Sequence, residues 1–451
     1  FSRIFTDSAL ELQVVDSTHP EYLRKVRDSL EPDQTLFIVA TKSGSTVETL
    51  SFFKFFYRWM IERLGEKQTG KHFIGITDPG SDLVDLASRY QFRELFLNDP
   101  EIGGRYSALS FFGLVPASLL GIEFPAILDS ARETAERCRT DPEADFNPGL
   151  RLGNALGLLA ANGRNHITFF SSPGLESFPH WAEQLLAEST GKEGKGLLPV
   201  IEEQPAAPES YQNQRVFISL QLADEDHPLE RIQALEDGGH PVIRIEIEHR
   251  EQLGGLFFLW EMATAVAGHH LGINPFDQPN VESAKRRAKQ HVEQYRRTGQ
   301  LVRGKSKRVE LQVLDSFLDN YLKPGGYLAI QAYLPPTTAV KKKLHGWQRS
   351  LQERYQLPVT LGFGPRYLHS TGQLHKGDAG RGLFVQLTSQ AEQDLPIPDE
   401  AAEKTSSITF GTLISAQALG DARALEEAGR QVIRFDLGTH PKAGLTGLSP
   451  T

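Results

Sequence analysis

Residues 35–49 read T-L-F-I-V-A-T-K-S-G-S-T-V-E-T, and they set the fold class. The first seven residues form a continuous apolar run, which is typical of a strand buried on both faces of a parallel sheet. A long helix is expected to follow over residues 46–64. Strands expected at 71–77 and 92–97 alternate with a helix at 81–90. Such alternation predicts a doubly wound α/β fold, whose ligands bind beyond the carboxyl ends of the strands.

The same alternation continues along the chain, and turn residues separate the segments. Further strands are expected at residues 10–16, 166–171, 216–222, 241–247, 327–333, 358–362, 382–387 and 432–437. Further helices are expected at residues 20–30, 150–160, 181–188, 229–237, 256–268, 281–296, 310–322, 338–355 and 409–429. We predict two doubly wound parallel-sheet domains, at residues 1–123 and 124–297, and a third, smaller repeat-like α/β unit at 308–451. A basic, polar linker is expected between the last two, at residues 298–307.

Two pairs of segments suggest an internal duplication. Residues 188–196 (E-S-T-G-K-E-G-K-G) resemble residues 369–377 (H-S-T-G-Q-L-H-K-G). Farther along, residues 234–244 (A-L-E-D-G-G-H-P-V-I-R) match 424–434 (A-L-E-E-A-G-R-Q-V-I-R). Because the two matches are collinear, we expect the second and third units to have arisen by duplication.

The composition excludes several classes of protein. The 451 residues carry a net charge of -9, which disfavours binding to nucleic acid or to an anionic membrane. The single cysteine, Cys138, cannot form an intrachain disulfide or a cysteine-rich metal site. No apolar run approaches the roughly 20 residues of a membrane span. We expect a cytoplasmic protein.

Hydroxyl side chains crowd the junction between the first apolar run and its helix. Thr41, Ser43, Ser45 and Thr46 surround a glycine at position 44, and Lys42 adds a positive charge. Backbone N–H groups at a helix start and flanking hydroxyls together suit a phosphate group. The alternative is an ordinary capped helix, with Glu48 completing a capping box.

Three further segments carry residues suited to chemistry. Residues 103–107 (G-G-R-Y-S) place Arg105 after two glycines, of which Gly104 would let the backbone approach a ligand closely. Residues 183–196 end a helix at Glu188, a candidate general base. Residues 275–285 (P-F-D-Q-P-N-V-E-S-A-K) combine a rigid loop with Lys285. Taken alone, the first segment is better explained as a glycine turn with a surface arginine, and the second equally well as a solvated helix end. The spacing in the third by itself indicates a helix start with an ion pair.

Together and in this order, the four segments resemble the glucose-6-phosphate isomerase family, over about residues 10–290. The stretch G-P-R-Y-L-H-S-T-G-Q-L-H-K-G at 364–377 is similar to the isomerase part of a form fused behind a transaldolase domain. The resemblance implies paired sugar-isomerase domains, no metal and no cofactor. It also implies a homodimer whose sites are completed by a neighbouring subunit, or else a third unit that replaces that neighbour.

The resemblance also implies a role for each candidate residue. Glu188 would move a proton between C2 and C1 of the sugar, Arg105 would lie beside the enediol, and Lys285 would act at the sugar end of the site. The substrate-binding residues would be Thr41, Lys42, Ser43, Ser45, Thr46, Glu48, Gly104 and Gln278.

The sequence departs from the family pattern at two places. The family's ring-opening histidine is replaced by Leu235, so we expect His369 to take its place, with His240, His375 or Lys285 and water as alternatives. The family's first strand and its glycine–serine turn are also missing, because the sequence starts at Phe1. We therefore expect one missing wall of the site, an upstream segment, and room for a fused transaldolase domain.

The sequence accordingly predicts an isomerase of glucose 6-phosphate and fructose 6-phosphate, in glycolysis and gluconeogenesis. One alternative is an enzyme that also accepts mannose 6-phosphate. Another is a non-catalytic, sugar-phosphate-binding regulatory module, which would usually lack the glutamate found here at position 188.

Overall fold

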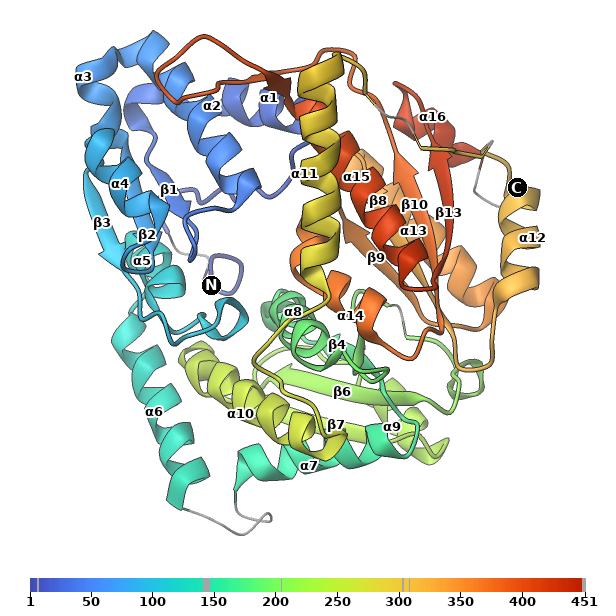
Figure 1. The fold of residues 1–451 in the computed structure, drawn as a ribbon. Coiled ribbons are helices and arrows are strands. Elements are labelled where there is room, and N and C mark those ends of the chain that lie inside the picture. The colour runs from blue at the N-terminus through green and yellow to red at the C-terminus, as the bar shows by residue number, and fades with distance from the viewer. Residues whose placement is uncertain (6–7, 141–146, 204, 302–303, 308, 448–451) are drawn as a thin grey trace.

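Three parallel β-sheets, each flanked by helices, build the structure (Figure 1). The structure is a computed structural model that describes the chain except residues 6–7, 141–146, 204, 302–303, 308 and 448–451. The alternation of strands and helices predicted from the sequence is confirmed. Within the described ranges, no helix is both long and apolar enough to cross a membrane.

The first sheet has the order β1-β2-β3, with all strands parallel. Phenylalanine rings seal it against the long helix α2: Phe37 stacks on Phe73 at 4.8 Å, and Phe53 meets Phe73 edge-on at 5.8 Å. This packing explains why the apolar run at 35–41 forms a strand, although of the strand residues only Val39 is buried, while Phe37 and Ile38 are half-buried and Ala40 is exposed. The elements are β1 (Phe37–Ala40), α2 (Val47–Leu64), β2 (Phe73–Thr77), α4 (Asp82–Arg89) and β3 (Glu94–Leu97).

The strand predicted at residues 10–16 is wrong, because these residues form no strand. Their alternating apolar side chains resemble a strand in sequence, but Leu10 and Val14 are 59% and 63% exposed. The segment is held by a hydrogen bond from the Tyr22 hydroxyl to the Val14 carbonyl oxygen at 2.8 Å. The alternation of apolar and polar residues therefore predicted a strand wrongly here, because this segment pairs with no strand of a sheet.

The second and third sheets share one topology. Their orders are β5-β4-β6-β7 and β13-β10-β8-β9, so in each sheet the first strand in sequence pairs with the second and the third. The strands of the second sheet are β4 (His166–Ser171), β5 (Leu198–Val200), β6 (Arg215–Leu222) and β7 (Val242–Ile247). Those of the third are β8 (Tyr327–Tyr333), β9 (Val359–Phe363), β10 (Gly382–Thr388) and β13 (Gln431–Asp436). A small antiparallel pair adds β11 (Pro396–Ile397) and β12 (Ile408–Thr409).

Equal topology supports a duplication, but only one of the two sequence matches falls at equivalent positions. Residues 234–244 and 424–434 both run from a helix into the last strand of their sheet. By contrast, residues 188–196 precede β5, whereas 369–377 follow β9. The similarity between 188–196 and 369–377 is therefore between segments at different positions of the shared topology.

The remaining helices cover the sheets and connect them (Figure 1). The long apolar helix α10 packs against α6 and α7 beside the second sheet, and α11 packs against α15 beside the third. Their bounds are α1 (Pro20–Ser29), α3 (Glu66–Thr69), α5 (Phe111–Leu119), α6 (Phe124–Thr140), α7 (Pro148–Ala161), α8 (Phe178–Thr190), α9 (Leu229–Asp237), α10 (Leu253–Leu271), α11 (Val281–Thr298), α12 (Leu311–Tyr321), α13 (Thr338–Tyr355), α14 (Thr371–Gly377), α15 (Phe410–Glu427) and α16 (Pro441–Thr446).

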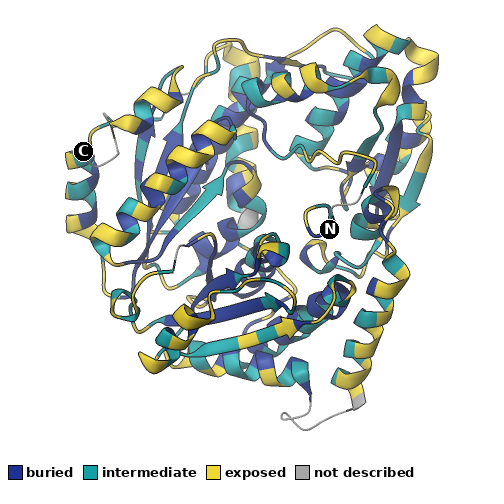
Figure 2. Cartoon of the chain, turned by 180° about the vertical axis from the view of Figure 1, so that it is seen from behind, coloured by how far each residue is buried: buried dark blue, intermediate teal, exposed yellow. Residues whose placement is uncertain are grey.

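The hydrophobic cores cross the domain boundaries expected from the sequence. The core beneath the first sheet includes Ile397, Ile408 and Phe410 from the C-terminal part of the chain. Ile4, at the other end, lies in the core of the second sheet. Figure 2 shows buried strands in the middle of each layer and exposed residues on the outer helix faces. The division into domains at 1–123, 124–297 and 308–451 stays a proposal. The shared hydrophobic cores hold these three parts of the chain together.

Candidate active site

The loop after β1 gathers hydroxyl groups at the start of α2. The Oγ1 atoms of Thr41 and Thr46 lie 2.9 Å apart, and the Oγ atoms of Ser43 and Ser45 also lie 2.9 Å apart. Gly44 has a φ of +70°, and a Cβ atom there would come within 2.6 Å of the backbone nitrogen of Asp82. Only glycine fits this position, because any side chain would collide with the start of α4.

Lys42 points its ammonium group at the next loop of the sheet. Its Nζ lies 2.9 Å from Oδ1 and 2.8 Å from Oδ2 of Asp78, directly after β2. The Lys42 side chain also lies next to Gly104, because a Cβ atom added to Gly104 would lie 3.9 Å from Lys42 Cδ. The predicted phosphate loop and the G-G-R turn are therefore neighbours.

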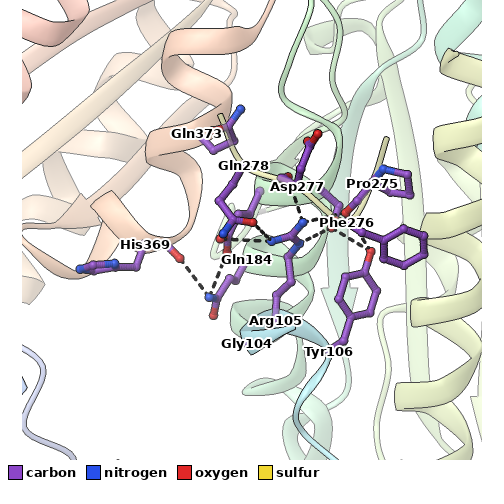
Figure 3. A network of polar contacts seen from close by, with 12 residues as sticks. Gly104, Arg105, Tyr106, Gln184, Pro275, Phe276, Asp277, Gln278, His369 and Gln373 are labelled. Carbon is purple, nitrogen blue, oxygen red and sulfur yellow. Dashed lines mark hydrogen bonds and ion pairs between the residues drawn. The ribbon is translucent and has the colours of Figure 1, made fainter. Parts of the chain in front are cut away.

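Arg105 is held at the centre of a polar network (Figure 3). It is 4% exposed, and its Nε donates to Ser189 Oγ at 2.7 Å. Nη1 donates to Gln278 Oε1 at 2.8 Å. Nη2 donates to the carbonyl oxygens of Pro275 at 2.7 Å and Asp277 at 3.1 Å. The guanidinium group thus ties the G-G-R turn to the end of α8 and to the loop that carries Gln278.

Glu188 faces this guanidinium group from the last turn of α8. Its Oε1 lies 3.3 Å from Arg105 Nη1, and its side chain is 13% exposed. Its Oε2 accepts a hydrogen bond from Gln184 Nε2 at 3.2 Å, and the same amide nitrogen donates to the carbonyl oxygen of His369 at 2.9 Å. One amide group therefore links the glutamate to the third unit.

Lys192 anchors the loop that follows α10. It is 1% exposed, and its Nζ donates to the carbonyl oxygens of Asn274 at 2.7 Å and Asp277 at 2.5 Å. It also contacts Asp277 Oδ1 at 2.6 Å. Burial lowers the pKa of Lys192, while the hydrogen bond and charge of Asp277 act in the opposite direction.

His369 pairs with a carboxylate of the first unit. Its Nε2 lies 3.3 Å from Glu48 Oε1, and that oxygen also accepts from Gln417 Nε2 at 2.6 Å. Burial acts to lower the pKa of His369, but the hydrogen bond and charge of Glu48 outweigh it and hold the pKa above its ordinary value. Burial acts to raise the pKa of Glu48, and the hydrogen bond from His369 lowers it below its ordinary value. The charge of Lys285 on α11 acts on both groups.

Glu48 does not complete a capping box, which was the alternative weighed for this residue. It occupies the second position of α2 after the N-cap Thr46, and its carboxylate turns to His369 and Gln417 instead. A carboxylate in the first turn of a helix is stabilised by the helix dipole, which adds to the attraction of the histidine.

The other histidines weighed for ring opening lie elsewhere. His240 Nε2 contacts the carbonyl oxygen of Pro208 at 2.9 Å, beneath the second sheet. His375 is 3% exposed among aromatic rings, and burial holds its pKa well below the ordinary value. Leu235 is 1% exposed in an apolar cluster. Of the histidine candidates, His369 lies close enough to Glu188 and Lys285 for their charges to act on it.

Several residues of this network were missed at the sequence level. Gln184 and Ser189 flank Glu188 on α8, and Lys192 stands in the E-S-T-G-K segment, so proximity to the motif was a usable signal. Gln417 lies 369 residues from its partner Glu48, and nothing in its neighbourhood marks it. Among the described residues, no group of three or more His, Cys, Asp or Glu is placed to hold a metal ion.

Comparison with known proteins agrees with this arrangement. Residues 4–198 match the family described as phosphoglucose isomerase. The glucose-6-phosphate isomerase of Rubrobacter xylanophilus is 31% identical over 317 residues, which span 61% of this chain and 72% of that protein. The enzyme of the same name from Heliobacterium modesticaldum is 28% identical over 313 residues, which span 59% of this chain and 68% of that protein.

Solved structures share the fold. A hypothetical protein from Thermus thermophilus matches with a TM-score of 0.58 and 26% identity, over 64% of this chain and 79% of that one. A glucose-6-phosphate isomerase from Chlamydia trachomatis matches with a TM-score of 0.51 and 21% identity, over 61% of this chain and 63% of that one, which supports the fold alone. The identity of 31% to the Rubrobacter enzyme, over 72% of that protein, shows that the chain belongs to the glucose-6-phosphate isomerase family of aldose–ketose isomerases.

Proposed function

We propose that this chain interconverts glucose 6-phosphate and fructose 6-phosphate by proton transfer between C2 and C1. The observation that carries the proposal is the cluster of Glu188, Arg105 and His369, which come from distant segments. Glu188 pairs with Arg105, and the Gln184 amide group links Glu188 to the backbone carbonyl oxygen of His369. Such a reaction belongs to glycolysis and gluconeogenesis, and we place it in the cytoplasm.

In this proposal the loop after β1 binds the phosphate of the sugar. The hydroxyl groups of Thr41, Ser43, Ser45 and Thr46 and the N–H groups at the start of α2 donate hydrogen bonds to it. Lys42 lies beside the loop, but its positive charge is offset by Asp78, so the hydroxyl and N–H groups supply most of the binding to the phosphate in this proposal. Binding the phosphate away from the reacting carbons holds the sugar in register.

Glu188 is the proposed base. Its carboxylate removes the proton from C2 of the open-chain aldose, and the C1 oxygen gains negative charge in the enediolate. The proton of the C2 hydroxyl group then passes to the C1 oxygen, and Glu188 returns the carbon-bound proton at C1, which leaves the carbonyl group at C2. The fixed positive charge of Arg105 beside Glu188 stabilises the charge that develops on oxygen. Gln278, held by Arg105 Nη1 at 2.8 Å, stands at the sugar end of the site.

His369 is the proposed ring-opening group, together with Lys285. Opening breaks the bond between C1 and the ring oxygen, so the C1 hydroxyl loses a proton and the ring oxygen gains one. The charge of Glu48 keeps His369 protonated to a higher pH, which suits a group that donates a proton to the ring oxygen. The ion pair also joins the first and third units across the cleft.

The test is a coupled assay of fructose 6-phosphate isomerisation with Glu188→Gln. Removing a general base is expected to lower turnover by roughly 10²–10⁴-fold. The matched control is Glu193→Gln, an exposed carboxylate in the following turn, which is expected to leave turnover unchanged. Equal activity of Glu188→Gln and the unmodified chain would contradict the mechanism. No activity in the unmodified chain, with sugar phosphate still bound, would indicate a regulatory module, and turnover of mannose 6-phosphate would indicate a dual isomerase.

A further inference from the structure

The second and third sheets contact each other in a reciprocal way. In the second sheet α8 follows the first strand, and in the third sheet α13 does. α8 donates from Gln184 to the carbonyl oxygen of His369, in the segment after β9. α13 donates from Gln352 Nε2 to Glu203 Oε1 at 3.0 Å, in the segment after β5. Reciprocal contacts of this kind are the signature of a twofold relation, so the proposed active cleft is expected to have a counterpart.

The counterpart is a cavity of about 550 Å³ beyond the carboxyl end of β4. Its lining includes Ser171 at the end of β4, the segment after β5 with Glu202, and one face of α13 with His345 and Arg349. Because β5 lies on one side of β4 and β6 on the other, this edge is the topological switch point of the second sheet. Ligands of doubly wound sheets bind at such a point.

The cavity opens at the end of α8 that lies away from Glu188. His180, in the first turn of α8, lines it, about 12 Å along the helix from Glu188 at 1.5 Å per residue. The two clefts are therefore separate, although one helix borders both.

Basic side chains from three segments line this cavity, and of these Arg3 and Arg349 are cations. His345 and Arg349 are four residues apart on α13 and so share one face. His180 stands in the first turn of α8, and Arg3 lines the cavity from the N-terminal segment. Convergence of these groups on one space suits a phosphate group.

The carboxylates of the cavity are accounted for by named partners, apart from the exposed Glu176. Glu203 accepts two hydrogen bonds from Arg215, both at 2.7 Å, which neutralises it. Glu202 lies 3.4 Å from His180 Nε2 and 3.7 Å from His345 Nε2, so it joins the second and third units. A carboxylate beside cations suits a sugar phosphate, whose hydroxyl groups donate hydrogen bonds while its phosphate accepts them.

We propose that this second cleft is a non-catalytic binding site for a phosphorylated sugar. Its phosphate lies against His345 and Arg349, and its hydroxyl groups lie against Glu202. The cleft binds without turnover, because α13 presents the cation Arg349 to it, whereas α8 presents the base Glu188 to the first cleft. A guanidinium group cannot remove a proton from carbon.

Calorimetric titration of the full chain with glucitol 6-phosphate, which has no carbonyl group to isomerise, tests the proposal. The expected result is two sites per chain. The double variant with His345→Ala and Arg349→Ala is expected to retain one site, with affinity at the other reduced at least about tenfold and kcat/KM for fructose 6-phosphate unchanged. Arg354→Ala, on the same helix and paired with Asp315, is the matched control and is expected to keep both sites.

Three results would overturn the proposal: one site in the unmodified chain, two undiminished sites in the double variant, or equal binding of glucitol without phosphate. Each of these leaves the proposed reaction intact, because that reaction is judged by Glu188→Gln. A second readout is the imidazole NMR signals of His180 and His345, which are expected to shift on addition of glucitol 6-phosphate in the Glu188→Gln background as well.

Discussion

Replacing Arg105 by lysine keeps the charge at the centre of the site and removes its geometry. The arginine makes five directed contacts: one to Ser189, one to Gln278, two to backbone carbonyl groups of the 275–277 loop and one to Glu188. A lysine has one nitrogen on a flexible stem and cannot reach these acceptors together. Several buried acceptors would therefore lose a charged donor.

The expected magnitude follows from these contacts. A hydrogen bond to a charged group contributes about 1.5–3 kcal/mol, and losses at one site overlap rather than add. Because lysine keeps the positive charge beside Glu188, the loss comes from these hydrogen bonds, and we expect Arg105→Lys to lower the free energy of unfolding by about 3 kcal/mol. A shift of Glu188 by about 1 Å is expected to reduce kcat/KM roughly 100-fold in addition.

Urea unfolding and the coupled isomerase assay measure the two effects. Arg354→Lys is the matched control, because its pair with Asp315 is 43% and 24% exposed and is expected to contribute less than about 1 kcal/mol. If Arg105→Lys unfolds within about 1 kcal/mol of the unmodified chain and keeps at least about half of its activity, the network does not hold the site as argued.

Three further predictions concern His369. Mixing Glu188→Gln with His369→Ala is expected to restore no activity, because both side chains reach one cleft from the same chain; recovery after mixing would show that the site is shared between two chains. In NMR titration the pKa of His369 is expected above its ordinary value of about 6.5, and Glu48→Gln is expected to lower it. Because the pKa is raised in the folded state, the ion pair stabilises the fold fully below the unfolded pKa, and this is lost as pH rises through the folded pKa. Unfolding of His369→Gln should thus differ most from the unmodified chain on the acid side, and a pH-independent difference would refute the pairing.

Most of the fold could be predicted from the sequence, because continuous apolar runs and turn residues mark buried parallel strands. The strands at 166–171 and 327–333 and the helix at 338–355 coincide with the predicted bounds. The prediction of a strand at 10–16 failed because two exposed apolar side chains there imitate, in sequence, the alternation of a half-buried strand.

The site likewise contains residues that local motifs reveal and residues that no local motif reveals. Glu188 and Arg105 belong to local motifs, and the structure brings them within 3.3 Å of each other. The pairing of Glu48 with His369 spans 321 residues, and no local pattern encodes it. The sequence placed His369 opposite Glu188 through a match that joins non-equivalent parts of two sheets. The two residues nevertheless lie near each other, because α8 packs against α14, the helix after His369. Beyond the end of α8, Gly194 donates its N–H to the carbonyl oxygen of Gly377 at 2.8 Å.

Joining two similar units in one chain changes what their clefts can become. In a symmetric pair of identical chains, any substitution appears in both clefts, so neither can lose its base without the other. Here α8 and α13 are encoded separately, and α8 carries Glu188 while α13 carries Arg349. The first cleft can thus keep a base, while the second exchanges it for a cation. Since α8 borders both clefts, a ligand held at its first turn by His180 acts on the same rigid helix that positions Glu188 at its last turn.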